Sequence, residues 1–172
     1  DDDDGTNPIP EYTKVQFEDL NGFESDENSI SMPAQLGSWT ASAFSEQSFT
    51  GDGKLTFTID NTKRLKVGLT AVDGGFDDID YNLELNWGNA YVAKDNSRVD
   101  GVISSYSSGD SFTIERNGNE IVFYHNGDEI HREAADVDPD VKLFVDVGGQ
   151  LVDSGISDVL LHSDNLFPSS GG

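Results

Sequence analysis

Two consecutive Asn-Gly pairs constrain this chain more than any other feature of its sequence. They lie at Asn117-Gly118 and Asn126-Gly127, within residues 109–130, and alternating apolar residues flank each pair. Asn-Gly favours the two-residue type I′ turn of a β-hairpin, because both central residues of that turn need a positive φ. The stretch therefore predicts a three-stranded antiparallel meander whose register is set by its two turns.

This register predicts one apolar face and one polar face. A two-residue loop at Asn117-Gly118 sets Ile114 opposite Ile121 and Phe112 opposite Phe123, and the second turn sets Phe123 opposite Ile130. Because side chains alternate along a strand, the intervening residues face the other way. They are Thr113, Glu115, Val122, Tyr124 and Glu129. A sheet with one apolar face needs a second layer to cover it.

Short stretches with a period of two recur along the rest of the chain and predict further strands. They comprise residues 14–20, 42–49, 54–59, 65–71, 79–85, 141–147 and 156–161. A type II′ turn at Gly88-Asn89 sets Leu85 opposite Val92. Residues 128–135 form the one segment where we expect a short helical turn. About ten short strands with Gly and Asn turns predict an all-β fold, a two-sheet antiparallel β-sandwich.

The chain has 172 residues and a formal net charge of −23. Its length fits one domain, which we place at residues 13–164, between an acidic linker at 1–12 and a C-terminal linker at 165–172. The negative charge repels phosphate backbones and anionic membranes, so we expect neither nucleic acid nor direct membrane insertion. There is no cysteine to form a disulfide, and no run of about 20 apolar residues. The linkers indicate a monomeric module of a larger protein.

The acidity has two interpretations, solubility and calcium binding. Calcium takes oxygen ligands, which acidic loops supply. Asp136, Asp138 and Asp140 in DVDPD are our candidate calcium ligands, and DGGFDD at residues 73–78 is a second acidic loop. Neither loop has the spacing of an EF-hand. Calcium is the one cofactor that the sequence suggests.

Carbohydrate binding requires aromatic faces that stack on sugar C–H surfaces and planar polar groups that hydrogen-bond sugar hydroxyls. Tyr91 and Tyr124 have outward parity in their hairpins and Trp87 lies beside a turn, so these three are the aromatic candidates. Tyr106 is a further aromatic candidate, in a loop. The polar candidates are Asn82, Glu84, Asn86 and Arg116. A half-exposed cross-strand partner is the alternative role for each strand tyrosine.

Several stretches carry a resemblance to a known family. They are KVGLT followed by FDDIDYNLEL, then GDSFTIER, then VFYHNG and a closing strand. In order and spacing, residues 15–161 resemble the concanavalin A-like lectin/glucanase sandwiches, in particular the laminin-G/SPRY-like modules of large bacterial surface and secreted proteins. The resemblance implies a concanavalin A-like jelly roll. That superfamily includes sugar binders, protein binders and enzymes, so the fold leaves the function open.

Glucanases of this superfamily carry a strand motif of the type E-x-D-x-x-E, and the nearest match is Asp78, Asp80 and Glu84. The leading Glu is missing, and an i, i+4 pair on a strand rising ~3.4 Å per residue exceeds the ~5 Å that a retaining glycosidase needs. The histidines lack a G-x-S-x-G motif and indicate no Ser-His-Asp site. We expect a noncatalytic carbohydrate-binding module of a secreted or cell-surface bacterial protein, with a polysaccharide as partner. The alternatives are a structural or adhesive spacer and a glucanase-like hydrolase.

Overall fold

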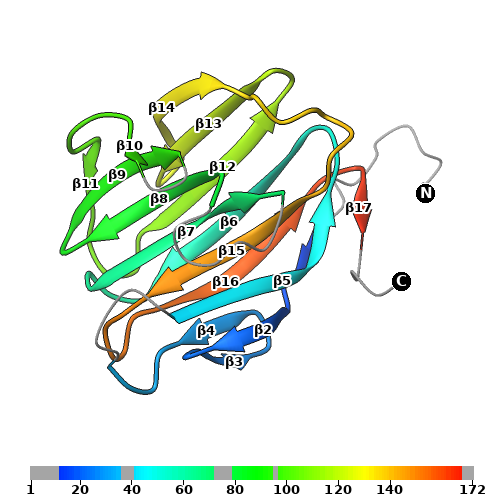
Figure 1. Ribbon diagram of the computed structural model, residues 1–172. Helices are drawn as coiled ribbons and strands as arrows, with labels where there is room; N and C mark the ends of the chain where they lie inside the picture. The colour runs from blue at the N-terminus through cyan, green and yellow to red at the C-terminus, as the bar shows by residue number, and fades with distance from the viewer. Residues whose placement is uncertain (1–11, 36–40, 72–78, 95–96, 168–172) are drawn as a thin grey trace, which may run out of the picture.

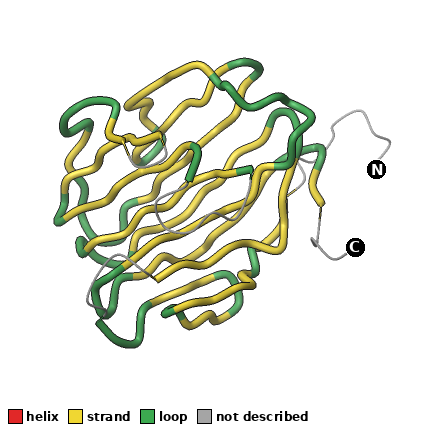
Figure 2. Tube along the Cα trace, in the orientation of Figure 1, coloured by secondary structure: helices red, strands yellow, loops and turns green. Residues whose placement is uncertain are grey.

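The computed structural model describes residues 12–35, 41–71, 79–94 and 97–167. Figure 2 draws these residues as strands and loops, with no helix among them. None of the described residues therefore belongs to a helix long and apolar enough to cross a membrane. The strands form two antiparallel sheets packed face to face (Figure 1), which confirms the predicted all-β sandwich.

The first sheet, which we call sheet 1, contains the meander. Its strand order is β14-β13-β12-β6-β16-β4-β3, and β1 pairs with β16. The strands are β1 (Tyr12–Lys14), β3 (Glu24–Asp26), β4 (Ser29–Ser31), β6 (Gly53–Ile59), β12 (Ser111–Asn117), β13 (Glu120–His125), β14 (Asp128–Ala134) and β16 (Gly155–His162).

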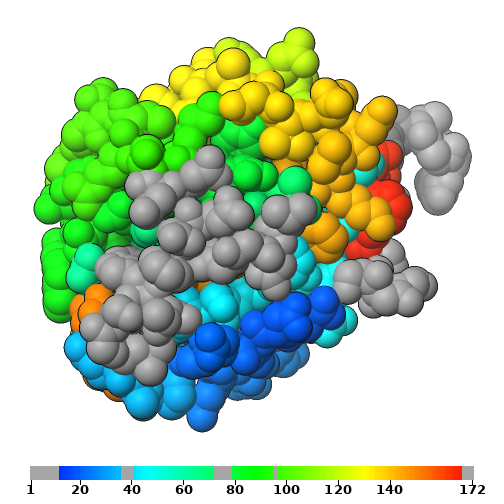
Figure 3. All heavy atoms as spheres, viewed as in Figure 1, coloured from blue at the N-terminus to red at the C-terminus, as the bar shows by residue number. Residues whose placement is uncertain are grey.

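The second sheet, sheet 2, has the order β10-β9-β8-β7-β15-β5-β17, with β11 beside β9 and β2 beside β5. Its strands are β2 (Phe17–Asn21), β5 (Ala41–Phe49), β7 (Arg64–Thr70), β8 (Tyr81–Asn86), β9 (Asn89–Lys94), β10 (Ser97–Arg98), β11 (Ser104–Ser105), β15 (Leu143–Gly149) and β17 (Leu166–Phe167). In the space-filling view the early strands β2–β4 (blue) lie at the opposite end of the molecule from β13 and β14 (Figure 3).

The chain crosses between the sheets where β5 ends and β6 begins. Gly51 has a φ of +68°, a conformation that glycine adopts without strain. At Gly53 a Cβ atom would lie 2.5 Å from the ring of Phe49 and 2.9 Å from the carbonyl oxygen of His162. The Gly51-Asp52-Gly53 turn therefore allows the backbone to pass close to a core ring, which a larger residue would prevent.

The inner faces of the two sheets form the hydrophobic core. In the meander Phe112, Ile114, Ile121 and Phe123 are fully buried, as predicted, and Ile130 is half-buried against the same core. The period-two pattern of the other strands is satisfied in the same way, since alternate residues of β6, β7 and β8 point inward.

Val122 is an exception on the outward face. It is paired with Glu115 and Arg132, as its parity requires, yet it is fully buried. The guanidinium of Arg132 bonds Glu120 and Glu129 across this surface. A long side chain held at its charged end covers apolar surface with its stem, so the predicted polar face contains a covered valine.

Two predicted hairpin registers are wrong by two residues. Asn117 pairs with Glu120, so Ile114 lies opposite Phe123 instead of Ile121. Gly118, with a φ of +63°, takes the first central position of that turn, which Asn117 was expected to fill. In the β8–β9 hairpin Trp87 and Gly88 form the loop, so Leu85 lies opposite Ala90 and not Val92. A shift of two residues keeps every side chain on its predicted face, because the side-chain period is two.

The second Asn-Gly turn is confirmed, but its hairpin contains an irregularity. Asn126 and Gly127 both have positive φ, as a type I′ turn requires. A bulge between Phe123 and Tyr124 then sets His131, in place of Ile130, opposite Phe123. The segment expected to form a helical turn is strand β14, because β13 supplies a pairing edge that overrides local preference.

The paired strands reach into both segments that the sequence predicted as linkers. Tyr12 in β1 pairs with His162, and Leu166–Phe167 in β17 pair with Phe49 and Ser48 of β5. Each end of the described chain is thus attached to a different sheet.

The burial of the meander predicts different stabilities for two adjacent aromatic substitutions. Phe123→Ala should lower the free energy of unfolding by roughly 3–5 kcal/mol, because it removes a fully buried ring and leaves a cavity. Tyr124→Ala, on the outward face, should cost about 1 kcal/mol or less. Urea unfolding of both variants measures the difference, and equal losses would contradict the assignment of the two faces.

Candidate functional site

The outer face of sheet 1 carries two parallel rows of polar and aromatic side chains. His162, Lys54 and Glu115 are cross-strand neighbours on β16, β6 and β12. In the next row Thr56 pairs with Thr113, and Thr113 pairs with Tyr124. These residues alternate with buried ones such as Leu55 and Ile114, so they face away from the core.

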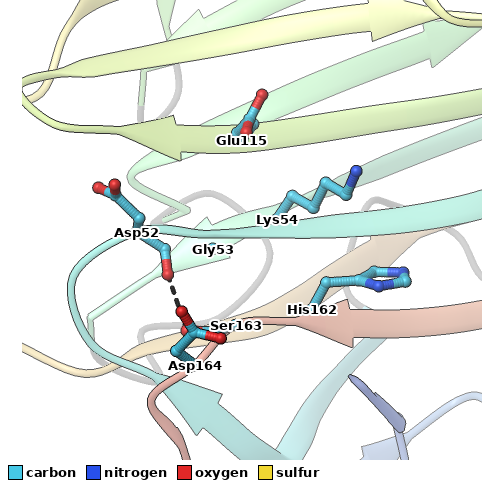
Figure 4. Close-up of a pocket in the computed structure, with 7 residues that line it drawn as sticks. All are labelled: Asp52, Gly53, Lys54, Glu115, His162, Ser163 and Asp164. Atoms are coloured by element: carbon cyan, nitrogen blue, oxygen red, sulfur yellow. Dashed lines mark hydrogen bonds between the residues drawn. The ribbon is translucent and has the colours of Figure 1, made fainter. Parts of the chain in front are cut away.

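Two adjoining hollows lie over these rows. One, of about 190 Å³ (Figure 4), is lined by Asp52, Gly53, Lys54, Glu115, His162, Ser163 and Asp164. The other, of about 250 Å³, is lined by Lys54, Thr113, Glu115, Tyr124 and Gly127. Because Lys54 and Glu115 line both hollows, the two are parts of one surface, which we call the sheet 1 groove.

Hydrogen bonds fix the end of the groove near the β5–β6 corner. Ser163 Oγ donates to the carbonyl oxygen of Asp52 at 2.7 Å, and the amide of Asn165 donates to Ser163 Oγ at 3.0 Å. Asp52 Oδ1 accepts from the amide of Gly118 at 2.8 Å. Figure 4 shows Lys54 and His162 extending to one side of this hollow, and Asp52 and Asp164 lying on the other.

Aromatic rings flank the groove at both ends. At one end Tyr12 is 60% exposed, and its ring lies 5.8 Å from the ring of His162. At the other end half-buried Tyr124 donates its phenolic hydrogen to Glu115 Oε1 at 3.0 Å. Tyr12 lies on β1, beside β16, so four strand intervals of ~4.8 Å separate the two tyrosines and the groove with its aromatic ends spans ~19 Å across the strands. Lys54, Glu115 and Thr113 lie between the rings.

The charges of the groove follow from its surroundings. Partial burial and then the positive charge of Lys54 lower the pKa of His162, so its imidazole is neutral at pH 7. Burial and the neighbouring Glu115 raise the pKa of Tyr124, which remains a hydrogen-bond donor. Three carboxylates, those of Asp52, Glu115 and Asp164, then line the groove against one ammonium group, that of Lys54. The groove therefore offers donors and acceptors to neutral ligands and repels anions.

The predicted residues of the β8–β9 hairpin lie on the outer face of the other sheet. Glu84 and Tyr91 are cross-strand partners, and both contact Arg98, which sequence analysis did not select. The guanidinium of Arg98 lies 3.6 Å from the centroid of the Tyr91 ring and donates to both carboxylate oxygens of Glu84. Arg98 thus covers a face of Tyr91. Asn82 is fully buried, donating to the carbonyl oxygen of Ile79, and Asn86 is half-buried.

Trp87 occupies a position that folding alone does not favour. It is 60% exposed and has a φ of +55° in the β8–β9 turn, where Asn or Gly is the usual residue. A bulky residue in this region is strained, and an exposed indole gains little from burial. Beside it, Asn86 Oδ1 is buried and has no hydrogen-bond partner among the described residues.

Two predicted site residues lie inside the sandwich. Arg116, 2% exposed, donates to the carbonyl oxygens of Gly118 at 3.2 Å and Asp138 at 3.4 Å. Tyr106, 6% exposed, packs edge-on against Phe112. Both therefore support the fold and do not form part of a binding surface. Arg116 and Phe112 lie an even number of positions apart on one strand, so the pattern predicted that both point inward. The charge of Arg116 led us to expect it at the surface instead.

In the candidate calcium loop the carboxylate of Asp136 is already bound by two other side chains. Asp136 accepts hydrogen bonds from the hydroxyl of Tyr81 at 2.7 Å and from Lys94 Nζ at 2.8 Å. Lys94 first, and then Tyr81, lower the pKa of Asp136, while burial and this carboxylate raise the pKa of Tyr81 to about 12. Asp138 and Asp140 are exposed. Within the described part of the chain no three acidic or histidine side chains converge to hold a metal ion, and the second acidic loop, residues 73–78, lies wholly outside that part.

The comparisons with known proteins concern structure. No protein-family profile matches this chain, and no curated protein sequence does. A human SPRY domain, 17% identical, superposes with a TM-score of 0.60 over 84% of this chain and 97% of that domain. The exoplasmic/lumenal domain of VIP36 in a Ca²⁺/Man3GlcNAc-bound form, 10% identical, gives 0.61 over 90% and 84%. The alginate lyase AlgAT5 of polysaccharide lyase family 7, 14% identical, gives 0.51 over 84% and 80%.

These neighbours, and this chain with them, have the concanavalin A-like β-sandwich fold. The fold that the resemblance implied is thus confirmed. The neighbours include a carbohydrate-bound lectin domain, a SPRY domain and a lyase, and at these identities the likeness shows the fold alone.

The conformation of Trp87 predicts that a smaller residue will stabilise the protein. Trp87→Asn should raise the free energy of unfolding by about 1 kcal/mol, because Asn adopts a positive φ more readily in a type I′ turn. Thermal or urea unfolding measures the change. A loss of stability would mean that the exposed indole contributes packing that exceeds its backbone strain.

The lowered pKa of His162 predicts a loss of stability in mild acid. The unfolded chain binds a proton at a pKa near 6.5, above that of the folded state. The stability that the protein has while His162 is neutral is therefore fully present above about pH 6.5, and part of it is lost as the pH falls through the folded-state pKa.

His162→Gln should reduce the stability difference between about pH 8 and about pH 5.5. Urea unfolding at the two pH values measures this difference, with His131→Gln as the matched control. An unchanged difference in His162→Gln would contradict the prediction.

Proposed function

We propose that this protein is a carbohydrate-binding module and that the sheet 1 groove holds a segment of a polysaccharide. The observation that carries the proposal is the pattern of the groove, with aromatic rings at both ends and an ammonium group, carboxylates and a threonine hydroxyl between them. Rings stack on the C–H faces of sugars, and the groups between them hydrogen-bond hydroxyls. A span of ~19 Å across four strand intervals suits a short run of sugar units.

Electrostatics favour a neutral glycan. The chain carries a net charge of −23, and carboxylates predominate in the groove. An acidic polysaccharide would meet repulsion both at long range and in contact, whereas neutral hydroxyls find acceptors at Glu115 and a donor at Lys54. We propose calcium only as an accessory ion, because Lys94 already neutralises Asp136.

Trp87 is our candidate for a second carbohydrate contact, on the other sheet. Strain at an exposed aromatic residue is a recurrent mark of a functional position, and planar amides adjoin it at Asn86 and Asn89. We place Tyr91 and Glu84 beside this contact as supporting residues, with Arg98 holding both in place, whereas Asn82 is fully buried and supports the fold.

We propose that the module binds glycans without cleaving their glycosidic bonds. Of the carboxylates that match a glucanase motif, Glu84 is engaged by Arg98, and Asp80 Oδ2 accepts from the amide of Ala71 at 2.9 Å. These contacts give both carboxylates a structural role, which supports binding without cleavage, and Asp78 lies outside the described residues. The lectin-like fold also supports a location outside the cytosol, since the VIP36 neighbour is an exoplasmic/lumenal domain, and we propose a monomeric module of a surface or secreted protein.

Binding to neutral polysaccharides tests the groove. The wild-type protein should be retarded in affinity gels that contain a neutral glucan, mannan or galactan, and Tyr124→Ala should weaken that binding by tenfold or more, since an aromatic contact is worth ~1 kcal/mol beyond its burial and covers apolar sugar surface as well. Tyr91→Ala, at a tyrosine of similar exposure on the other sheet, measures the contribution of the Trp87 contact separately.

Two outcomes would contradict this assignment. Weakening by Tyr91→Ala with no effect of Tyr124→Ala would move the site to sheet 2. No retardation across a broad glycan panel would favour the alternative of a structural or adhesive spacer.

A further inference from the structure

Three polar side chains from separate segments meet at the end of the sandwich, where the two sheets adjoin. Ser104 Oγ lies 3.0 Å from His125 Nδ1, and His125 Nε2 lies 2.8 Å from Asp110 Oδ2. Ser104 belongs to β11 of sheet 2, His125 ends β13 of sheet 1, and Asp110 immediately precedes β12. A nucleophile within hydrogen-bond reach of a base, with that base oriented by a third group, is the arrangement of nucleophilic catalysis.

The base and the acid are held rigidly. The ring of His125 stacks on that of Phe112, with centroids 4.9 Å apart and planes 19° apart. Asp110 Oδ2 also accepts from the amide of Ser107 at 2.9 Å, and the backbone of Asp110 bonds to Ser107 and Ile59. The chain therefore orients these groups before any ligand arrives, which lowers the cost of a reaction there.

The hydrogen bonds determine which imidazole nitrogen carries the proton. The amide of Ser107 first, and then His125, lower the pKa of Asp110, so it is a carboxylate at neutral pH and can only accept. In the neutral imidazole the proton therefore lies on Nε2, and the lone pair of Nδ1 faces Ser104 Oγ. The other contact of this hydroxyl, with the carbonyl oxygen of Ser105, is longer at 3.2 Å.

The group is partly exposed to solvent. The side chains of His125 and Asp110 are 16% and 22% exposed, and Ser104 is half-buried. A small molecule can therefore approach Ser104 from the surface. Since the protein carries a net charge of −23, neutral esters will approach more readily than anionic ones.

We propose that Ser104 is a nucleophile activated by His125, with Asp110 as a positioning residue, and that it transfers acyl groups from neutral short-chain esters to water. Ser104 Oγ bonds to the carbonyl carbon as its proton passes to His125 Nδ1. The bond from that carbon to the alkoxy oxygen then breaks, and the departing alcohol takes the proton from His125.

Water completes the cycle. It attacks the acyl-serine carbon while His125 Nδ1 takes one of its protons. The bond between that carbon and Ser104 Oγ breaks, and Ser104 Oγ regains the proton from His125, which releases a carboxylic acid. No redox partner or metal enters this balance. Ser104, His125 and Asp110 do not line the sheet 1 groove. A failed test of this activity would therefore leave the glycan-binding proposal intact, and the reverse also holds.

A fluorophosphonate probe tests the nucleophile directly. Ser104 Oγ should displace fluoride from phosphorus and form a stable phosphonyl-serine, which peptide mass spectrometry locates. Ser104→Ala should abolish this labelling, whereas Ser105→Ala, its exposed neighbour on β11, should retain it. His125→Gln should slow labelling by roughly 10²–10⁴-fold, the usual contribution of a general base.

A second readout separates catalysis from structural support. Wild-type protein should hydrolyse p-nitrophenyl acetate with a rate that rises along a sigmoid with pH, and His125→Gln should lose that dependence while circular dichroism confirms that it folds. Asp110→Asn should lower the rate and keep the fold, because its amide oxygen still accepts from Ser107. Absence of label on Ser104 in the folded wild-type protein, or equal labelling of His125→Gln, would overturn the proposal.

Discussion

The burial of two apolar sheet faces against each other is the constraint on which the rest of this structure depends. Each strand alternates its side chains, so a strand that supplies Phe112 and Ile114 to the core must place Thr113 and Glu115 outside. The same packing that stabilises the domain therefore builds two polar outer surfaces. Function in such a sandwich depends on the side chains that the strands expose on the outer faces and on the residues that meet at the strand ends.

Strand order then decides which outward residues become neighbours. Lys54 and Glu115 are far apart in the chain and adjoin only because β6 pairs with β12, and His162 joins them because β16 lies on the other side of β6. Antiparallel pairing brings cross-strand side chains within ~5 Å of each other. The groove is thus assembled from strands β16, β6, β12 and β13, and its aromatic ends are separated by the width of the strands between them.

The outer surfaces also show how a strongly acidic chain distributes its few cations. Arg98 binds the carboxylate of Glu84, Arg132 bridges those of Glu120 and Glu129, and Lys94 binds that of Asp136. Exposed pairs of this kind add little stability singly. Their effect here is to occupy neighbouring groups. Arg98 covers a face of Tyr91, and Lys94 binds the Asp136 carboxylate that a calcium ion would have needed. The Asp136 loop is therefore a weaker metal site than its composition suggests.

Periodicity and turn chemistry by themselves determined the all-β class, the strand segments and the burial of residues such as Phe123 and Ile114, because these depend on local backbone geometry and on a side-chain period of two. They also placed Tyr124 and Tyr91 on outward faces. Only the tertiary structure decided that these two tyrosines belong to different sheets, that Arg116 and Tyr106 are buried, and that Ser104, Asp110 and His125 meet. The physical reason is that a strand's own sequence sets which way its side chains point, whereas the identity of its neighbours is settled by the packing of the whole chain around one core.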